Sequence, residues 1–279
     1  MNKPLLTAAA GLLLVFLLFF FGRTTAPKTS KAVTAEAAPV FSIQTWIDSV
    51  ENTLTPSQSA LLNTFKPGLQ SADPNQKLQS YGAAAAFWKD SVQLFEPYAF
   101  YISEASKLEN SEKSLTFAAH LMLDNIRMQQ DPARLEWMTA ETIDLFERAI
   151  QLNPENDDLR IGLGSAYIFG RGRDGNPEAT MKGIQELLGV AQRDSNNMKA
   201  QLVLGIGGMI SGQFDKANAR FLRIVEKEPG NLEAIAYLAD TYAAMGNKEE
   251  AIRWYNISKK LADNPHYSQE VDERIRQLR

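Results

Sequence analysis

The feature that most constrains the fold is a recurring spacing of 34 residues in the C-terminal half of the chain. Similar residues return at this offset in two consecutive stretches, which begin near Leu204 and Leu238. Self-similarity at a fixed period of about 20–50 residues is typical of repeat proteins, in which one small unit stacks on the next. The matching positions are Leu204 and Leu238, Gly205 and Ala239, Gly208 and Tyr242, Gly212 and Gly246, Ala217 and Ala251, and Phe221 and Tyr255.

A third unit precedes these two. Leu163-Gly164 matches Leu204-Gly205 at an offset of 41 residues, seven more than the later spacing. The segment GRGRDGN, residues 170–176, accounts for the seven and falls where the two helices of a unit are expected to turn. The upstream stretch LFERAIQLNP, which ends near Pro154, has the pattern of another helix end.

These positions resemble the tetratricopeptide repeat, whose pattern of Leu-Gly, an aromatic residue, Ala-x3-Phe and a closing Pro spans a helix, a turn and a helix. Residues 198–231 and 232–265 fit it well, and residues 157–197 fit with the insertion. The resemblance implies an all-α fold, a right-handed superhelical α-solenoid. Ser195 and Asp263 stand where proline is common, and Gly183 where alanine is usual.

The rest of the chain divides around these three repeats. Ser42 is placed to cap a first helix, and a second is expected to begin near Pro56. The final segment, YSQEVDERIRQLR, is amphipathic and charged, as a capping helix of a repeat stack must be. The predicted parts are an N-terminal transmembrane anchor (1–23), a flexible linker (24–40), N-terminal helices (41–76), divergent repeat-like helix pairs (77–156), three repeats (157–265) and a C-terminal capping helix (266–279).

Four glycines lie close together in LGIGGMISGQFDKANARF, residues 204–221. A phosphate-binding loop would require a preceding strand and a helix N-terminus directed at the anion. Here the glycines fall within a predicted helix, and the Lys-Ser/Thr of such a loop is missing. We therefore expect Gly205 to allow close helix packing, and Gly212 and Gly246 to end helices in a left-handed conformation. Gly207 and Gly208 either admit a bulky neighbouring side chain or are simply tolerated.

Residues 5–22 carry no charge and are mostly Leu, Val and Phe near their end. Their length meets the minimum of about 17–25 residues for a membrane-spanning helix. A cleaved signal peptide is the alternative, because Val33-Thr34-Ala35 has the small residues of a cleavage site, although it lies far beyond the apolar run. We expect an uncleaved N-terminal transmembrane helix, with residues 24–40 as a flexible tether.

Basic residues on the two sides of this segment are too evenly balanced to fix the topology. A short N-terminal tail before a large domain favours export of the domain, so we expect it to be membrane-anchored and periplasmic, with the cytoplasmic side left open.

Composition excludes several classes of site. The chain has no cysteine and only two histidines, His120 and His266, so disulfides, thiolate metal sites and histidine-rich sites are not expected. A net charge of −4 argues against nucleic-acid binding. We expect His120 to be a core histidine, His266 to be exposed, and Arg171–Gly175 to form a solvated turn that could alternatively contact an anion. No cofactor or metal is predicted.

In stacked helix pairs, the first helices line a concave groove. Its middle is predicted to be apolar, which suits an apolar peptide or helix. The family's carboxylate-clamp members place Lys, Arg and Asn on this face, which this chain does not. The alternative is that residues 41–75 fold back and fill the groove. The predicted groove residues are Asp158, Ile161, Ser165, Ile168, Lys199, Leu202, Ile206, Met209, Glu233, Ala236 and Asp240.

These observations predict a membrane-tethered, non-catalytic scaffold that binds a partner protein or peptide, with self-association left open. A narrower alternative, by analogy with the family alone, is an accessory factor of an envelope assembly pathway such as cytochrome c maturation. An enzyme with an unrecognised site is a further alternative, but no paired carboxylates or nucleophile motif support it.

Overall fold

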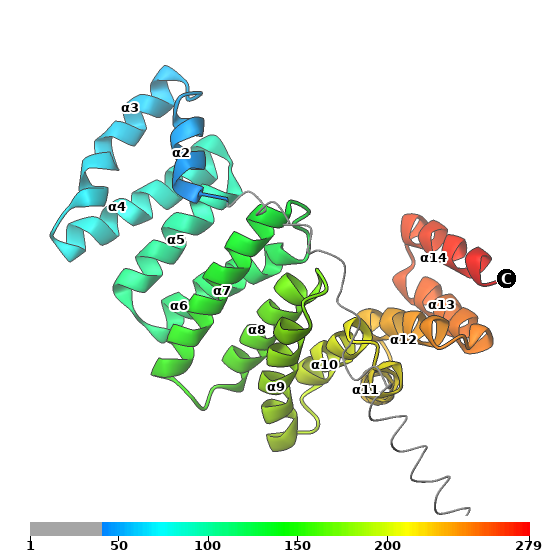
Figure 1. The fold of residues 1–279 in the computed structure, drawn as a ribbon. Helices are drawn as coiled ribbons and strands as arrows, with labels where there is room; N and C mark the ends of the chain where they lie inside the picture. The colour runs from blue at the N-terminus through cyan, green and yellow to red at the C-terminus, as the bar shows by residue number, and fades with distance from the viewer. Residues whose placement is uncertain (1–40) are drawn as a thin grey trace, which may run out of the picture. The chain divides into compact units, whose positions relative to one another are not determined.

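The computed structural model describes residues 41–279, and the predicted anchor and linker lie outside the described residues. Within the described part every regular element is helical, and the first helices of successive pairs follow one another along one face (Figure 1). None of its helices is both long enough and apolar enough to cross a membrane. The α-helices are α2 (Ile43–Glu51), α3 (Pro56–Phe65), α4 (Pro74–Ala86), α5 (Phe95–Glu109), α6 (Glu112–Ile126), α7 (Pro132–Leu152), α8 (Asp157–Tyr167), α9 (Pro177–Arg193), α10 (Met198–Ile210), α11 (Phe214–Lys227), α12 (Leu232–Ala244), α13 (Lys248–Ala262) and α14 (Pro265–Leu278).

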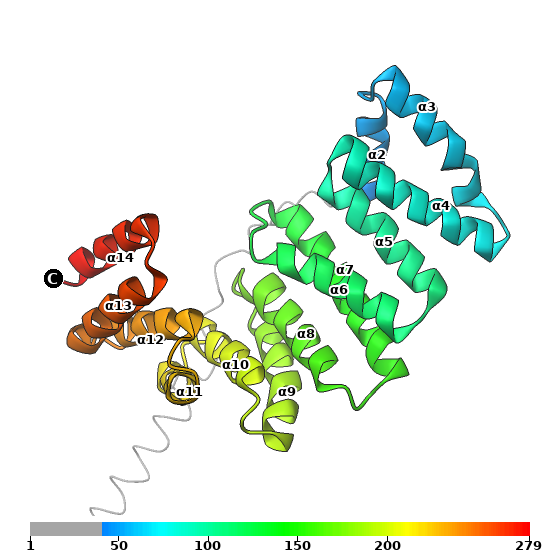
Figure 2. The same cartoon turned by 180° about the vertical axis from the view of Figure 1, so that it is seen from behind.

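Consecutive helices pack in pairs, and each pair packs on the next, as the view from behind also shows (Figure 2). The pairs are α4 with α5, α6 with α7, α8 with α9, α10 with α11, and α12 with α13, followed by α14. Each of the ranges 157–197, 198–231 and 232–265 contains two helices. The first helices α6, α8, α10 and α12 contact one another in order, so they form one continuous face.

Side chains at the helix starts explain where the helices begin. An Asn, Asp, Ser or Thr side chain accepts a hydrogen bond from the first turn and so satisfies a backbone N–H that has no partner inside the helix. Two of the turns inside repeats end at Gly212 and Gly246, whose φ angles of +73° and +77° confirm the predicted left-handed role. The capping residues are Ser42, Thr55, Asp73, Ser111, Asp131, Asn156, Asn176, Asn197, Asn231, Asn247 and Asn264.

Glycines inside the helices allow close packing, as predicted for Gly205. A Cβ atom on Gly205 would lie 2.5 Å from Cε1 of Phe221, which belongs to the second helix of the same pair. A Cβ on Gly207 would lie 2.9 Å from Cδ1 of Ile168, so this glycine does admit a bulky neighbour. The four glycines therefore lie in α10 and the turn that follows it, and the closest contacts of Gly205 and Gly207 are with apolar side chains.

The N-terminal helices do not fill the concave groove. Helices α2 and α3 pack against α4, α5 and the π-helical turn at Phe87–Val92. Ile47 and Leu62 are buried there in one cluster with Phe87 and Trp88. The alternative that residues 41–75 cover the groove is wrong, because their apolar side chains pack against the aromatic residues of α4, α5 and the π-helical turn between them.

The insertion in the first predicted repeat also has a structural role. A π-helical turn at Ile168–Gly172 extends α8, and the chain then turns at Gly175 before α9. Arg171 forms a bidentate ion pair with Glu136 on α7, with N–O distances of 2.6–3.0 Å. Arg173 donates hydrogen bonds to the carbonyl oxygens of Ile126, Arg127 and Gln129, at the end of α6. Arg173, Asp174 and Gly175 are exposed, as predicted for this turn, but Gly172 is buried and both arginines are bound within the chain.

Candidate functional site

The face formed by the first helices contains a cavity of about 470 Å³. Its position follows from the stacking, because α6, α8, α10 and α12 each present one side to the same space. A cavity of this size lies within the range of about 300–1,000 Å³ that is typical of ligand pockets. The lining residues are Thr116, His120, Leu123, Asp124, Arg127, Asn156, Asp158, Ile161, Gly162, Ser165, Phe169, Lys199, Leu202, Val203, Ile206 and Glu233.

The floor of this concave cavity is apolar. Ile161 and Ile206 are only 7% and 5% exposed, so they are part of the core that joins α8 to α10. Leu202 and Phe169 are partly exposed and pack on the same core. The Ser165 hydroxyl is already used, since it donates to the carbonyl oxygen of Ile161 at 2.7 Å. Ligand contacts on the floor would therefore be made by aliphatic and aromatic side chains.

The rim of the concave cavity is charged, and most of its charges are paired. Lys199 lies 3.5 Å from Asp158, where both side chains are well exposed to water. Arg127 lies 2.5 Å from Glu233. Within the described part of the chain, Asp124 forms no ion pair and is exposed at the edge of the cavity. The rim thus has one acidic side chain in excess.

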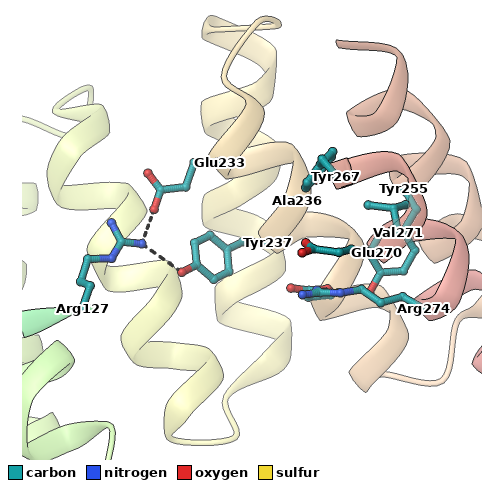
Figure 3. A pocket seen from close by; sticks show the side chains of 10 residues that line it. Arg127, Glu233, Ala236, Tyr237, Tyr255, Tyr267, Glu270, Val271 and Arg274 are labelled. Atoms are coloured by element: carbon teal, nitrogen blue, oxygen red, sulfur yellow. Dashed lines mark hydrogen bonds and ion pairs between the residues drawn. The ribbon is translucent and has the colours of Figure 1, made fainter. Parts of the chain in front are cut away.

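Arg127 spans the concave face. It follows the last residue of α6, yet its guanidinium donates to Glu233 and, at 3.2 Å, to the hydroxyl of Tyr237, both on α12 (Figure 3). The same guanidinium lies 4.6 Å from the ring centre of Phe169. Burial opposes its charge, but the hydrogen bond and the negative charge of Glu233 outweigh this and raise the pKa of Arg127. One side chain therefore connects the first helices of pairs that are not adjacent in the stack.

His120 lines the concave cavity from α6. Its ring meets the ring of Phe146 edge to face, with centroids 5.2 Å apart. Burial lowers the pKa of His120, and the nearby carboxylate of Asp124 offsets part of this effect. Burial therefore favours the neutral form of this histidine. It is partly buried beside a core aromatic residue, rather than enclosed in the core as expected. His266 is exposed, as predicted.

The structure brings most of the predicted groove residues to this face, although it does not test their contact with a partner. Met209 lies next to the concave cavity, in a smaller apolar pocket of about 290 Å³ that it shares with Ile206 and Phe169. Ala236 and Asp240 line a third pocket, of about 290 Å³, between α12 and α14. Seven predicted residues line the concave cavity together, namely Asp158, Ile161, Ser165, Lys199, Leu202, Ile206 and Glu233.

Two of the predicted groove residues stabilise the fold and do not line the concave cavity. Ile168 is fully buried in the contact between α8 and α10, because the π-helical turn directs it over Gly207. Asp240 accepts hydrogen bonds from the hydroxyl of Tyr255 at 2.5 Å and from Arg274 of α14 at 2.7 Å. Burial, followed by the bond to Asp240, raises the pKa of Tyr255. Ile168 is therefore a core residue, and Asp240 fixes the capping helix.

Sequence reasoning missed the contribution of α6. Thr116, His120, Leu123, Asp124 and Arg127 line the concave cavity, but the predicted groove began only with the repeat at 157–197. The spacing of these residues along one helical face was a usable signal. Phe169 was also missed, because it lies directly before the insertion, where the repeat pattern gives no register.

No group of three or more acidic or histidine side chains within residues 41–279 is arranged to hold a metal ion. The predicted lack of a cofactor is not tested by this observation and stays a prediction.

Comparison with known proteins supports the repeat assignment. The family model of the tetratricopeptide repeat matches residues 209–269. This stretch begins in α10 and ends in α14, so it includes most of the two units with the regular 34-residue spacing. The C-terminal part of the chain is therefore similar to tetratricopeptide repeats.

One human protein is also similar to this chain in sequence. Tetratricopeptide repeat protein 6 of Homo sapiens is 25% identical over 127 residues, which are 46% of this chain and 24% of the human protein. The chain thus matches only about a quarter of the length of that relative.

Among solved structures, the tetratricopeptide repeat protein TTC0263 of Thermus thermophilus is similar with a TM-score of 0.52 at 15% identity, over 72% of this chain and 98% of that chain. MamA is similar with a TM-score of 0.48 at 15% identity, over 68% and 93%. The likeness to TTC0263 extends the repeat fold beyond the matched segment.

Proposed function

We propose that this protein is a non-catalytic scaffold whose concave cavity binds a peptide segment of a partner protein. The observation that carries the proposal is the apolar floor of the concave cavity, formed by Ile161, Leu202 and Ile206 inside a charged rim. Peptide-binding grooves combine apolar contact with a few oriented polar groups in this way. The concave surface of stacked repeats supports binding rather than chemistry.

The rim indicates the chemistry of the peptide. Its two cations, Arg127 and Lys199, already have carboxylate partners, whereas Asp124 has none within residues 41–279. The favoured ligand therefore carries a large apolar side chain for the floor and a basic side chain for Asp124. This differs from recognition of a C-terminal carboxylate, which would require free cations in the groove.

We further propose that residues 1–23 anchor the protein in a membrane with the helical domain on the exported side. The uncharged run of 18 residues from Leu5 to Gly22 supports this proposal. Carbonate washing of membranes tests the anchor, because an integral protein stays in the pellet while a processed protein is released. Fusion of alkaline phosphatase to the C-terminus tests the topology, since the phosphatase is active only when exported.

Site-specific photo-crosslinking in cells tests the peptide site. A photoreactive phenylalanine analogue at Leu202, on the floor of the concave cavity, is expected to capture a partner in the full-length protein. The same analogue at Leu261 is the matched control, because Leu261 is an exposed leucine on α13 outside the cavity. Equal capture at both positions would contradict the proposed site.

A charge substitution provides a second test of the peptide site. Leu202→Arg places a cation on the apolar floor, and we expect at least a tenfold loss of the partner identified by crosslinking. Leu261→Arg makes the same chemical change on an exposed surface and should leave binding unchanged. Circular dichroism of both variants separates loss of the site from loss of the fold. Retained binding in a folded Leu202→Arg protein would refute the proposal.

A further inference from the structure

A second cavity lies on the side of the repeats formed by the second helices of two pairs. It occupies about 410 Å³ between α9 and α11, and Leu188, Ala191 and Ala219 give it an apolar floor. Lys216, Arg220 and Arg223 also line it. None of the predicted concave-groove residues lines this second-helix groove, so it is a separate feature of the molecule.

The cations of the second-helix groove follow from the sequence of α11. Lys216, Arg220, Arg223 and Lys227 are spaced by four, three and four residues, so they fall on one side of the helix. Ala217, Phe221 and Ile224 are on the buried side. The basic stripe therefore lies next to the buried side of α11, and its members Lys216, Arg220 and Arg223 line the groove between α11 and α9.

The cations that line the second-helix groove have no carboxylate partner within residues 41–279, unlike most arginines of the chain. Within residues 41–279, each arginine except Arg220, Arg223 and the C-terminal Arg279 lies within 4 Å of a carboxylate oxygen. Arg220 and Arg223 instead donate to neutral oxygens, the side-chain oxygen of Gln201 at 2.6 Å and the carbonyl oxygen of Ser195 at 3.3 Å. Lys216 donates to the side-chain oxygen of Gln213 at 2.7 Å.

Arg220 is the most informative of the three because it is partly buried. A guanidinium has five N–H donors, and in the described part of the chain one of those of Arg220 is bonded, to a single amide oxygen. Burial lowers the pKa of Arg220, and the neighbouring charge of Arg223 lowers it further. The fold thus holds two like charges beside a cavity without a compensating anion, although the chain as a whole carries a net charge of −4.

We propose that the second-helix groove binds an acidic peptide segment of a partner protein, with carboxylates at Arg220 and Arg223 and an apolar side chain on Leu188. The planar guanidinium binds a carboxylate through two parallel hydrogen bonds, which gives such a site both strength and orientation. The recessed apolar floor favours a peptide over a flat anionic membrane surface. Residues 24–40 of the chain do not fit the charge, since they contain Lys28 and Lys31 but only one acidic residue, Glu36.

Calorimetric titration of the full-length protein in detergent tests this proposal. The probe is a capped peptide of Glu-Glu-Leu repeats, and the matched control probe has Gln-Gln-Leu repeats. We expect the acidic probe to bind and the neutral probe to bind at least tenfold more weakly. Binding should also weaken as salt is raised, because exposed charges are screened. Equal binding of the two probes, or no binding of either, would overturn the proposal.

Two variants locate the binding. Arg220→Gln/Arg223→Gln should weaken the acidic probe at least tenfold, whereas Lys248→Gln/Lys260→Gln, with the same change in charge on exposed residues of α13, should not. Lys216→Glu/Arg223→Glu alters only exposed side chains and gives the same test if the first variant does not fold. An equal loss in the α13 control would show a non-specific charge effect and overturn the assignment.

Two further measurements distinguish other occupants. Soluble dihexanoyl phosphatidylglycerol is titrated in place of the peptide, and tighter binding of this lipid that requires Arg220 would replace the peptide with a lipid headgroup. Sedimentation of wild type and the arginine variant detects self-association, and a dimer lost in the variant would make a second copy the occupant. Either result would overturn the proposal. The crosslink at Leu202 is unaffected by the arginine variant if the two sites are independent.

Discussion

In helices α2–α5, large aromatic side chains fill the core, whereas in α8–α11 glycines allow helices to approach closely. Trp88 and Phe87 are buried in the N-terminal cluster, with their ring centroids 5.3 Å apart. In the later pairs, a Cβ on Gly164 would lie 2.7 Å from Leu187, and one on Gly205 would lie 2.5 Å from Phe221. The first region is stabilised by large side chains that fill its core. The second is stabilised by close helix packing, which is possible only because glycine has no side chain.

This difference predicts opposite sensitivities to substitution. A region packed around a large ring is damaged most by removing volume, because the cavity that remains is only partly closed by relaxation. A region packed through glycine is damaged by adding volume, because its neighbours must move off their preferred rotamers. Since each helix pair mainly contacts its neighbours, the damage in both cases should remain largely local.

Trp88→Ala is expected to have the largest effect. Trp88 is fully buried, and truncation of a buried tryptophan or phenylalanine typically costs about 3–5 kcal/mol. Native-state hydrogen exchange should show faster exchange throughout α2–α5 and little change in α10–α13. Uniform acceleration along the whole chain would instead mean that the two regions unfold as one unit.

Trp88→Phe is the matched control. It preserves most of the ring volume, and it removes an indole N–H that forms no hydrogen bond in the structure. We expect a cost below about 1.5 kcal/mol, in the range of conservative core substitutions. A loss as large as that of Trp88→Ala would indicate that the indole nitrogen, rather than ring volume, stabilises the region.

The two regions also differ in how well the sequence predicts them. The 34-residue spacing predicts the helix pairs of the last two repeats because the leucine, glycine and aromatic positions recur there. Nothing comparable recurs around Trp88, whose partners Ile47, Leu62 and Tyr101 come from three different helices. Such long-range packing leaves no local periodicity, so sequence reasoning predicted helices at 41–76 but left their position open.

The concave cavity shows the same limit. Ile161, Leu202 and Ile206 could be placed on one face from helical spacing alone. The ion pair between Arg127 and Glu233 could not, because it joins residues 106 positions apart and depends on the curvature of the stack. The structural role of Asp240 could not be predicted either, because its partner Arg274 lies on the capping helix, outside the repeats.

Gly205→Ala is expected to have the next largest effect. The new methyl group would meet the ring of Phe221, which is fully buried and cannot move freely. We expect destabilisation of about 1–3 kcal/mol, as for other overpacked cores. Chemical denaturation measures the change, and hydrogen exchange should locate it in α10 and α11. An unchanged or increased stability would contradict the idea that this space must remain empty.

Gly82→Ala makes the same chemical change in the aromatic-packed region. Gly82 lies within α4, and apart from its chain neighbours and the backbone of its own helix, no atom lies within 4 Å of the position its Cβ would take. Alanine favours the helix over glycine by about 1 kcal/mol, so this substitution should stabilise the protein. If the two substitutions change the free energy of unfolding in opposite directions, packing decides the outcome, because the change in helix propensity is the same in both.

Arg173→Ala is expected to have the smallest effect, and it tests the connection between the glycine-packed region and the end of α6. Arg173 comes from the insertion after α8 and donates to three carbonyl oxygens at the end of α6, including that of Arg127. Because its side chain is one-third exposed, we expect a cost of about 1 kcal/mol, below the usual value for charged hydrogen bonds.

Exchange should accelerate at the last turn of α6, where the backbone loses its cap. Arg148→Ala, which removes only an exposed ion pair with Asp144, is the control and should cost about 0.5 kcal/mol or less. Because the insertion holds the backbone from which Arg127 reaches Glu233, the Arg173 variant should also weaken capture at Leu202. Unchanged capture together with faster exchange in α6 would mean that the end of α6 can loosen without disturbing the concave cavity.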